Sequence, residues 1–199
     1  MTYVEPEWAM VTVMFVDIRG FTTFADRATS RVAGEYLRDF FEVVIPIVER
    51  HGGEVNNLLG DGLLALFRAS EHADAALASG IEMLATVDST FGDRCKIGVG
   101  INSGLVLMGT IGGGGYTAFG LVGDPVNVAA RVQDATKDVG VPLLLTEATR
   151  MLLEIPQSKL VSRGTLELRG KPAPVAVYGL AVTNSGHTAR RTDSDVGAH

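Results

Sequence analysis

Two aspartates, Asp17 and Asp61, stand where a pair of carboxylates could hold metal ions. Asp17 ends the apolar run MVTVMFVD (10–17), and Asp61 lies at the Gly-Asp-Gly tip of HGGEVNNLLGDGLLALF (51–67). Two carboxylates form a hard oxygen site that suits Mg²⁺ or Mn²⁺ and that substrate phosphates can complete. Two such ions about 3.5–4 Å apart can activate an attacking oxygen and neutralise a leaving phosphate. Taken singly, each aspartate is explained better as an ordinary residue of its turn, because Asp before Gly is common there.

A second polar pair lies in VGDPVNVAARVQ (122–133). Asn127 and Arg131 are four residues apart, so in a helix they share one face among apolar neighbours. An amide can orient a sugar, and an arginine can bind a phosphate through two parallel hydrogen bonds. A pair of polar residues on a helix surface explains the same spacing equally well.

The segment IRGFT (18–22) follows the first apolar run. Gly20, at a turn from strand to helix, would let backbone N–H groups point outward and cradle a phosphate. The signal is weak alone, because the chain has no GxxxxGK[ST] and no GxGxxG motif. The glycine run at 112–115 has no lysine or helix start directly after it, so we interpret it as a hairpin turn.

The elements that must position these residues follow from periodicity and turn signals. We expect a strand at 10–17, a helix from Ser30 to Gly52-Gly53, a hairpin around Asp61 and a helix at 71–91. Two strand-like runs (95–104 and 105–112), a helix at 124–137, a strand at 142–146, a short helix at 147–153 and short strands over 158–182 follow.

This order predicts an α+β fold, a ferredoxin-like βαββαβ sheet with helices on one face plus a small β-rich C-terminal part. The first strand and the hairpin are neighbours in such a sheet, so Asp17 and Asp61 are expected to meet at one edge. We expect one domain over 1–182 and a disordered polar tail over 183–199.

The composition narrows the classes of function. The 199 residues are 46% hydrophobic and 20% charged, with a net charge of −6, as in a soluble globular protein. The negative charge argues against a nucleic-acid binder. The single cysteine, Cys95, favours a reducing compartment, and we expect a cytoplasmic protein. No apolar run approaches the roughly 18–20 residues of a membrane span.

Together the motifs resemble the class III nucleotidyl (adenylyl/guanylyl) cyclase catalytic domain. The segments that carry the resemblance are FVDIRGFT (15–22), LLGDGLLALF (58–67), VGINSGLVLMGTIG (99–112) and GDPVNVAARV (123–132). Their joint occurrence, in this order and spacing, is highly specific, and the resemblance runs from about residue 10 to about 181. It implies a signalling enzyme that converts ATP into 3′,5′-cyclic AMP and pyrophosphate.

The resemblance also implies roles for individual residues. Two ions, Mg²⁺ or Mn²⁺, would be bound at each site by Asp17, Ile18 and Asp61. The triphosphate would be held by Arg19, Gly20, Phe21, Thr22 and Lys171. Asn127 would position the ribose, and Arg131 would stabilise the α-phosphate in the transition state. In this family two domains pair head to tail, so a homodimer would have two sites at its interface and a monomer none.

Two positions depart from the family pattern. The residues that read the purine base are usually Lys with Asp or Thr in adenylyl cyclases, and Glu with a small polar residue in guanylyl cyclases. Here they are Asn57 and Gly120, which match neither set. Asn57 carries both donors and an acceptor, and Gly120 offers no side chain. We therefore expect weakened selectivity between ATP and GTP. Leu105 also replaces an arginine that some members carry.

Other functions stay open at this point. The alternatives are a guanylyl or base-promiscuous cyclase, a catalytically weak cyclase-fold domain that serves as a dimerisation or regulatory partner, and a phosphate-binding module without catalysis. A diguanylate cyclase is a poor fit, because GGEV (52–55) precedes the hairpin turn instead of forming it.

Overall fold

The structure is a computed structural model that describes residues 3–113, 115–168 and 170–181. Its first part is the expected ferredoxin-like unit, made of β1 (Glu7–Ile18), α2 (Ser30–Arg50), β2 (Glu54–Leu59), β3 (Gly62–Phe67), α3 (His72–Phe91) and β4 (Ile97–Gly113). The strands lie in the order β2-β3-β1-β4, and β1 is antiparallel to both of its neighbours. The predicted fold class is therefore confirmed.

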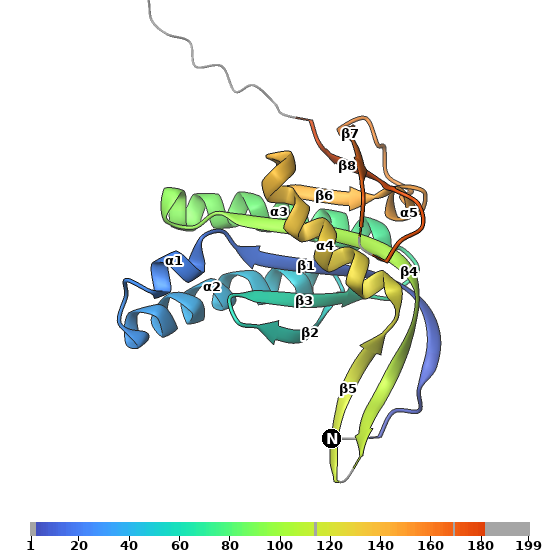
Figure 1. Ribbon diagram of the computed structural model, residues 1–199, viewed down its shortest axis with the longest axis horizontal. Helices are drawn as coiled ribbons and strands as arrows, with labels where there is room; N and C mark the ends of the chain where they lie inside the picture. The colour runs from blue at the N-terminus through green and yellow to red at the C-terminus, as the bar shows by residue number, and fades with distance from the viewer. Residues whose placement is uncertain (1–2, 114, 169, 182–199) are drawn as a thin grey trace, which may run out of the picture.

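The remaining elements extend the sheet beyond β4. They are β5 (Tyr116–Val122), α4 (Asp124–Val139), β6 (Leu143–Thr146), α5 (Glu147–Arg150), β7 (Leu160–Leu166) and β8 (Val175–Leu180). The sheet continues from β4 through β6 and β8 to β7, while β5 pairs with the far part of β4 and forms the arm at the bottom of Figure 1.

Helices cover both faces of the sheet. On one face α2 and α3 pack on alternate residues of β1, β3 and β4 such as Met14, Leu63 and Val99, which are buried. On the other face α4 crosses in front of β1 and β4 in Figure 1, and its Ala129 packs in a cluster with Val13. The two helices of the ferredoxin-like unit thus share a face as expected, and the later helix α4 takes the opposite one.

Three local expectations differ from the structure. The runs at 95–104 and 105–112 form one continuous strand, β4, because β1 pairs with it from Ile97 to Met108 without a break. The strand β5 and the five-residue helix α1 (Phe21–Ala25) were not expected, and α1 buries no residue that would give a periodic signal. The predicted tail at 183–199 lies outside the described residues.

Within the described part of the chain, no helix combines the length and the apolar character needed to cross a membrane.

Candidate active site

The two aspartates meet at the end of β1. The pairing of β1 with β3 sets Asp17 opposite Gly62, the residue directly after Asp61. A Cβ atom on Gly62 would lie 2.5 Å from the backbone oxygen of Val16 and 3.1 Å from Oδ1 of Asp17. The hairpin tip can therefore approach β1 this closely only because position 62 has no side chain.

The environment of Asp17 disfavours its charged form. Burial, then the negative charges of Asp61 and Asp134, raise the pKa of Asp17 from 3.8 to about 6, and a hydrogen bond with Asp61 adds to the rise. The positive charge of Arg19 acts in the opposite direction. A carboxylate that two other carboxylates repel would be stabilised by a bound cation. Among the described residues no three His, Cys, Asp or Glu side chains converge on one metal position, so oxygens from the backbone or from a substrate would have to complete the ligand set.

The loop after β1 is anchored by Arg19. Its backbone N–H donates to the carbonyl of Lys96 at 2.8 Å, and its Nη2 donates to the carbonyl of Val141 at 2.9 Å. Both groups thus hold the loop against the rest of the fold. Phosphate binding by this segment would depend more on Gly20, which has a φ of 73°, and on the first-turn N–H groups of α1.

A cavity of about 290 Å³ opens beside Asp17 and Asp134. Its lining residues come from the end of β1 and from α4, and they are Asp17, Ile18, Arg19, Gly20, Gln133, Asp134, Thr136 and Lys137. The cavity joins carboxylates to a lysine, so it has the charge balance to hold a cation together with an anionic group.

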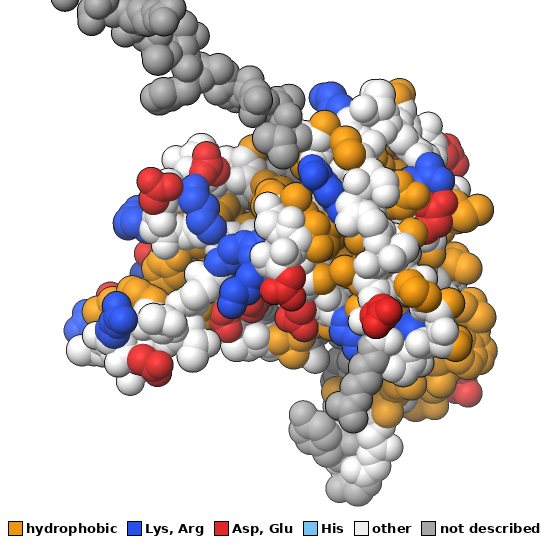
Figure 2. All heavy atoms as spheres, turned by 45° about the horizontal axis from the view of Figure 1, so that its top comes forward, with side chains coloured by type: hydrophobic (Ala, Val, Ile, Leu, Met, Phe, Trp, Pro, Cys, Tyr) orange, Lys and Arg blue, Asp and Glu red, His pale blue; other side chains and the backbone are white. Residues whose placement is uncertain are grey.

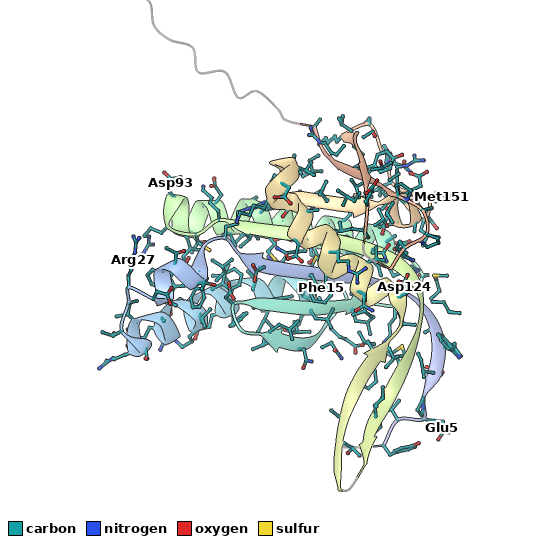
Figure 3. All side chains as sticks on the ribbon, viewed as in Figure 1. Glu5, Phe15, Arg27, Asp93, Asp124 and Met151 are labelled. Atoms are coloured by element: carbon teal, nitrogen blue, oxygen red, sulfur yellow. The ribbon has the colours of Figure 1, made fainter. Side chains whose placement is uncertain are left out.

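Two other predicted residues, Asn127 and Lys171, gather at the first turn of α4, whereas Arg131 lies in the middle of that helix, two residues before Gln133 of the cavity lining. Asn127 is exposed at the first turn, and the ammonium group of Lys171 pairs with the carboxylate of Asp124 at the first residue of the helix. Figure 3 shows Asp124 at the opposite end of the sheet from Arg27, which follows α1. The structure thus brings Lys171 and Asn127 to one end of α4 and the aspartate pair to the other end of the sheet.

The separation of these two groups can be measured along β4. Asp17 pairs with Gly98, whereas the first turn of α4 packs on Gly104, where a Cβ would lie 2.5 Å from Cγ of Pro125. Six residues of strand span about 20 Å at 3.4 Å each. A nucleotide triphosphate held by the aspartates of one chain is therefore out of reach of the first turn of α4 of the same chain.

The two positions that were expected to read the base are also far apart. Asn57 is exposed on the edge strand β2, opposite Leu64, next to a bulge. Gly120 lies on β5 opposite Gly109. Four strand-to-strand steps separate β2 from β5, which is about 19 Å at 4.8 Å each. One chain alone does not assemble a pocket from these two positions.

Sequence reasoning missed Asp134 and the anchoring role of Arg19. Asp134 lies on α4, and its effect on Asp17 depends on how that helix crosses the sheet. The close approach is visible at Gly100, where an added Cβ would lie 2.2 Å from the backbone nitrogen of Gln133. The alternation of glycines in IGVG (97–100) was the available signal, because it marks a strand on which a helix backbone rests.

Comparisons with known proteins point to one family. The model of the adenylate and guanylate cyclase catalytic domain matches residues 4–182. An adenylate cyclase of Anabaena cylindrica is 30% identical over 183 residues, covering 84% of this chain and 36% of that protein. An uncharacterized protein of Mycobacterium tuberculosis is 35% identical over 173 residues, covering 83% of this chain and 30% of that protein. The chain thus spans about a third of the length of these relatives.

Solved structures share the fold. The adenylyl cyclase CyaB from P. aeruginosa superposes with a TM-score of 0.81 at 23% identity, covering 90% of this chain and 97% of that one. The guanylyl cyclase Cya2 superposes with a TM-score of 0.79 at 24% identity, covering 92% and 97%. Because one neighbour is an adenylyl and the other a guanylyl cyclase, the fold alone does not select the base.

Proposed function

The chain belongs to the adenylate and guanylate cyclase catalytic domain family, and from this premise we propose that it converts ATP into 3′,5′-cyclic AMP and pyrophosphate. The domain would comprise residues 1–182 and act in the cytoplasm, where its substrate is found and where a free buried cysteine such as Cys95 stays reduced. The observation that carries the proposal is the carboxylate pair of Asp17 and Asp61, held about 20 Å from the first turn of α4.

Two Mg²⁺ or Mn²⁺ ions would be held by the two carboxylates and Ile18. Bound metal would lower the pKa of the ribose 3′-hydroxyl and draw charge from the phosphates. The chain's own groups would orient the substrate: the loop at 19–22 and Lys171 would bind the triphosphate, and Asn127 would hold the ribose. Arg131 would place its positive charge where negative charge develops on the α-phosphate.

The site would be completed by a second copy of the chain. The separation between the aspartates and the first turn of α4 supports a head-to-tail homodimer in which the aspartates of one subunit face Asn127 and Lys171 of the other. Arg131, further along the same helix, would act on the same side as these two residues. An exposed apolar strip supports self-association as well: Met10 pairs with Leu105 across β1 and β4, and both are half exposed. Hydrophobic side chains are exposed over the right-hand part of the face in Figure 2. Exposed apolar patches of this kind mark interaction sites.

Complementation tests the shared site. Asp17→Ala and Arg131→Ala would each be inactive alone, because each removes one component from both sites of its homodimer. In an equal mixture half of the dimers are mixed, and each mixed dimer keeps one intact site, so about a quarter of the wild-type activity should return. Two inactive variants that stay inactive when mixed would contradict a shared site, provided that subunit exchange is shown by a tagged partner.

Base selectivity is the second part of the proposal. The relative from Anabaena cylindrica is an adenylate cyclase, which supports ATP as the substrate. Asn57 and Gly120, which match neither base-reading pattern, support turnover of GTP as well. Formation of both cyclic nucleotides with Mn²⁺, measured over a range of protein concentrations, decides this point. A preference above about a hundredfold, or about 2.7 kcal/mol, would contradict weak selectivity. No product from either triphosphate would favour the regulatory or binding-module alternatives.

A further inference from the structure

A continuous path of hydrogen-bonded, buried polar side chains crosses the sheet. It begins at His72, the first residue of α3, whose Nδ1 lies 2.7 Å from Oγ1 of Thr12 on β1. Thr12 in turn lies 2.7 Å from Oγ of Ser103 on β4. The side chains between the two ends of this hydrogen-bonded path are at most 5% exposed. They are Thr12, Ser103, Thr149, Thr146 and Asn102.

The path continues to the first turn of α4. Ser103 donates to Oγ1 of Thr149 at 3.1 Å, and the hydroxyls of Thr149 and Thr146 lie 3.4 Å apart. Thr146 then donates to Oδ1 of Asn102 at 2.7 Å. Asn102 completes the path, because its Nδ2 donates to the carbonyl of Pro125 at 3.0 Å. The path therefore joins α3, β1, β4, β6, α5 and α4.

Counting protons fixes the direction of every bond. The carbonyl of Pro125 can only accept, so Asn102 must turn its NH₂ group toward α4 and its oxygen toward Thr146. Thr146 has one proton and gives it to Asn102, so Thr149 must donate to Thr146, and Ser103 must donate to Thr149.

The same count extends to the other end. Because the proton of Ser103 is used, Thr12 must donate to Ser103, and His72 must donate to Thr12 from Nδ1. Each hydroxyl thus donates once, and no side chain of the path can reverse alone without setting two acceptors or two donors face to face. Such buried networks are rigid when every member is satisfied.

The first turn of α4 depends on this contact more than most helix starts do. Its N-cap is Gly123, which supplies no side-chain hydrogen bond. Other contacts that hold this turn are the packing of Pro125 on Gly104, the packing of Val126 on the cluster around Val13, and the ion pair of Lys171 with Asp124. An exposed ion pair restrains a helix weakly, so the amide of Asn102 is the principal directional contact.

We propose that Asn102 is a positioning residue for Asn127 and Arg131, and that the hydroxyl path from His72 holds its amide in the required orientation. This inference rests on the proposed function of α4. Asn102 touches no substrate group; it acts through the backbone of Pro125, which sets the register and tilt of the helix that carries the two functional side chains.

The principal test is Asn102→Asp, which keeps the shape and the acceptor for Thr146 but replaces the donor that faces Pro125 by an oxygen. We expect kcat to fall about tenfold at pH 8 while KM changes less than twofold. The loss should shrink at pH 6, because a protonated carboxyl group restores the donor.

A matched pair of serine variants provides the control. Ser103→Ala breaks the path without touching α4, and it should lower kcat at least threefold. Ser79→Ala removes a hydroxyl that is equally buried and that finds no hydrogen-bond partner among the described residues. It should leave kcat within 1.5-fold of wild type.

Amide hydrogen exchange over residues 126–131 gives a readout that does not need turnover. Exchange should be at least fivefold faster in Asn102→Asp and unchanged in Ser79→Ala. If the wild-type chain makes no cyclic nucleotide, the proposed function fails, and exchange still decides whether Asn102 holds α4. Unchanged exchange in Asn102→Asp, or faster exchange with an unchanged kcat, would overturn the inference.

Discussion

Replacing Asp61 by Asn should stabilise the metal-free protein and remove most of its stabilisation by metal. Burial and the neighbouring charge of Asp61 raise the pKa of Asp17 to about 6 from 3.8. The folded chain then holds the proton of Asp17 more tightly than the unfolded chain does. The folded state therefore loses stability as the pH rises from about 4 through about 6, and the full loss is present above pH 6.

The size of the effect follows from the shift. A rise of about 2 units corresponds to about 3 kcal/mol at 1.36 kcal/mol per unit. Asp17 is only half-buried, so solvent screening reduces this to about 1–2 kcal/mol. The charge of Asp61 is the second cause of the raised pKa after burial. Its removal should therefore raise the free energy of unfolding by about 1 kcal/mol. Metal binding acts in the other direction: a cation at a hundred times its Kd stabilises the wild type by about 2.7 kcal/mol.

The assay is urea unfolding at pH 8 and one protein concentration, in EDTA and in excess Mn²⁺. Asp61→Asn should be about 1 kcal/mol more stable than wild type in EDTA, with the gain absent at pH 4, and should lose most of the stabilisation by Mn²⁺. Asp138→Asn is the control, because it removes one exposed negative charge from α4 that does not act on Asp17. An Asp61→Asn protein that is less stable in EDTA, or that keeps the full Mn²⁺ response, would refute the reasoning.

Three further predictions follow from single contacts. Gly62→Ala should cost about 1–3 kcal/mol of stability and weaken Mn²⁺ binding, because its Cβ would collide with the β1 backbone beside Asp17; thermal unfolding with and without Mn²⁺ measures both. Lys171→Ala should change stability by less than about 1 kcal/mol, since its pairing with Asp124 is exposed, yet lower cyclase activity; parallel unfolding and activity assays separate the two effects. Burial lowers the pKa of His72 below 6.5, so the native state should lose stability as the pH falls through about 6.5 and below. His72→Asn keeps a hydrogen-bond donor but does not titrate. Its free energy of unfolding should therefore decline less than that of the wild type between pH 8 and pH 5.

The fold was predictable where hydrophobic periodicity is strong. Apolar residues at intervals of three and four predicted α2 and α3 to within a few residues. The Gly-Asp-Gly turn predicted the hairpin that brings Asp61 to Asp17. The break expected after Gly104 was wrong for a tertiary reason. The polar residues Asn102 and Ser103 resemble turn residues, but the buried hydroxyl path satisfies them inside the strand.

The meeting of Asp17 and Asp61 at one edge of the sheet was predictable, whereas the side chains that surround it were not. Neighbouring strands of a ferredoxin-like sheet place Asp17 beside Asp61 whatever the loops do, so local order and topology were sufficient. The approach of Asp134 and the engagement of Arg19 with Val141 depend on how α4 and the segment before β6 pack on the sheet. That packing is decided by glycines and small side chains, which carry little periodic signal.

Two separate equilibria should control this domain. The repulsion between Asp17 and Asp61 should make its fold respond to a divalent cation, and that response should need only one chain. Under the proposed function, the 20 Å between the aspartates and the first turn of α4 should make turnover depend on a second chain, whatever the metal concentration. Stabilisation by Mn²⁺ should therefore saturate at protein concentrations at which specific activity is still rising. If both saturated together, metal binding itself would require the dimer, and the carboxylate pair of one chain would not be a metal site on its own.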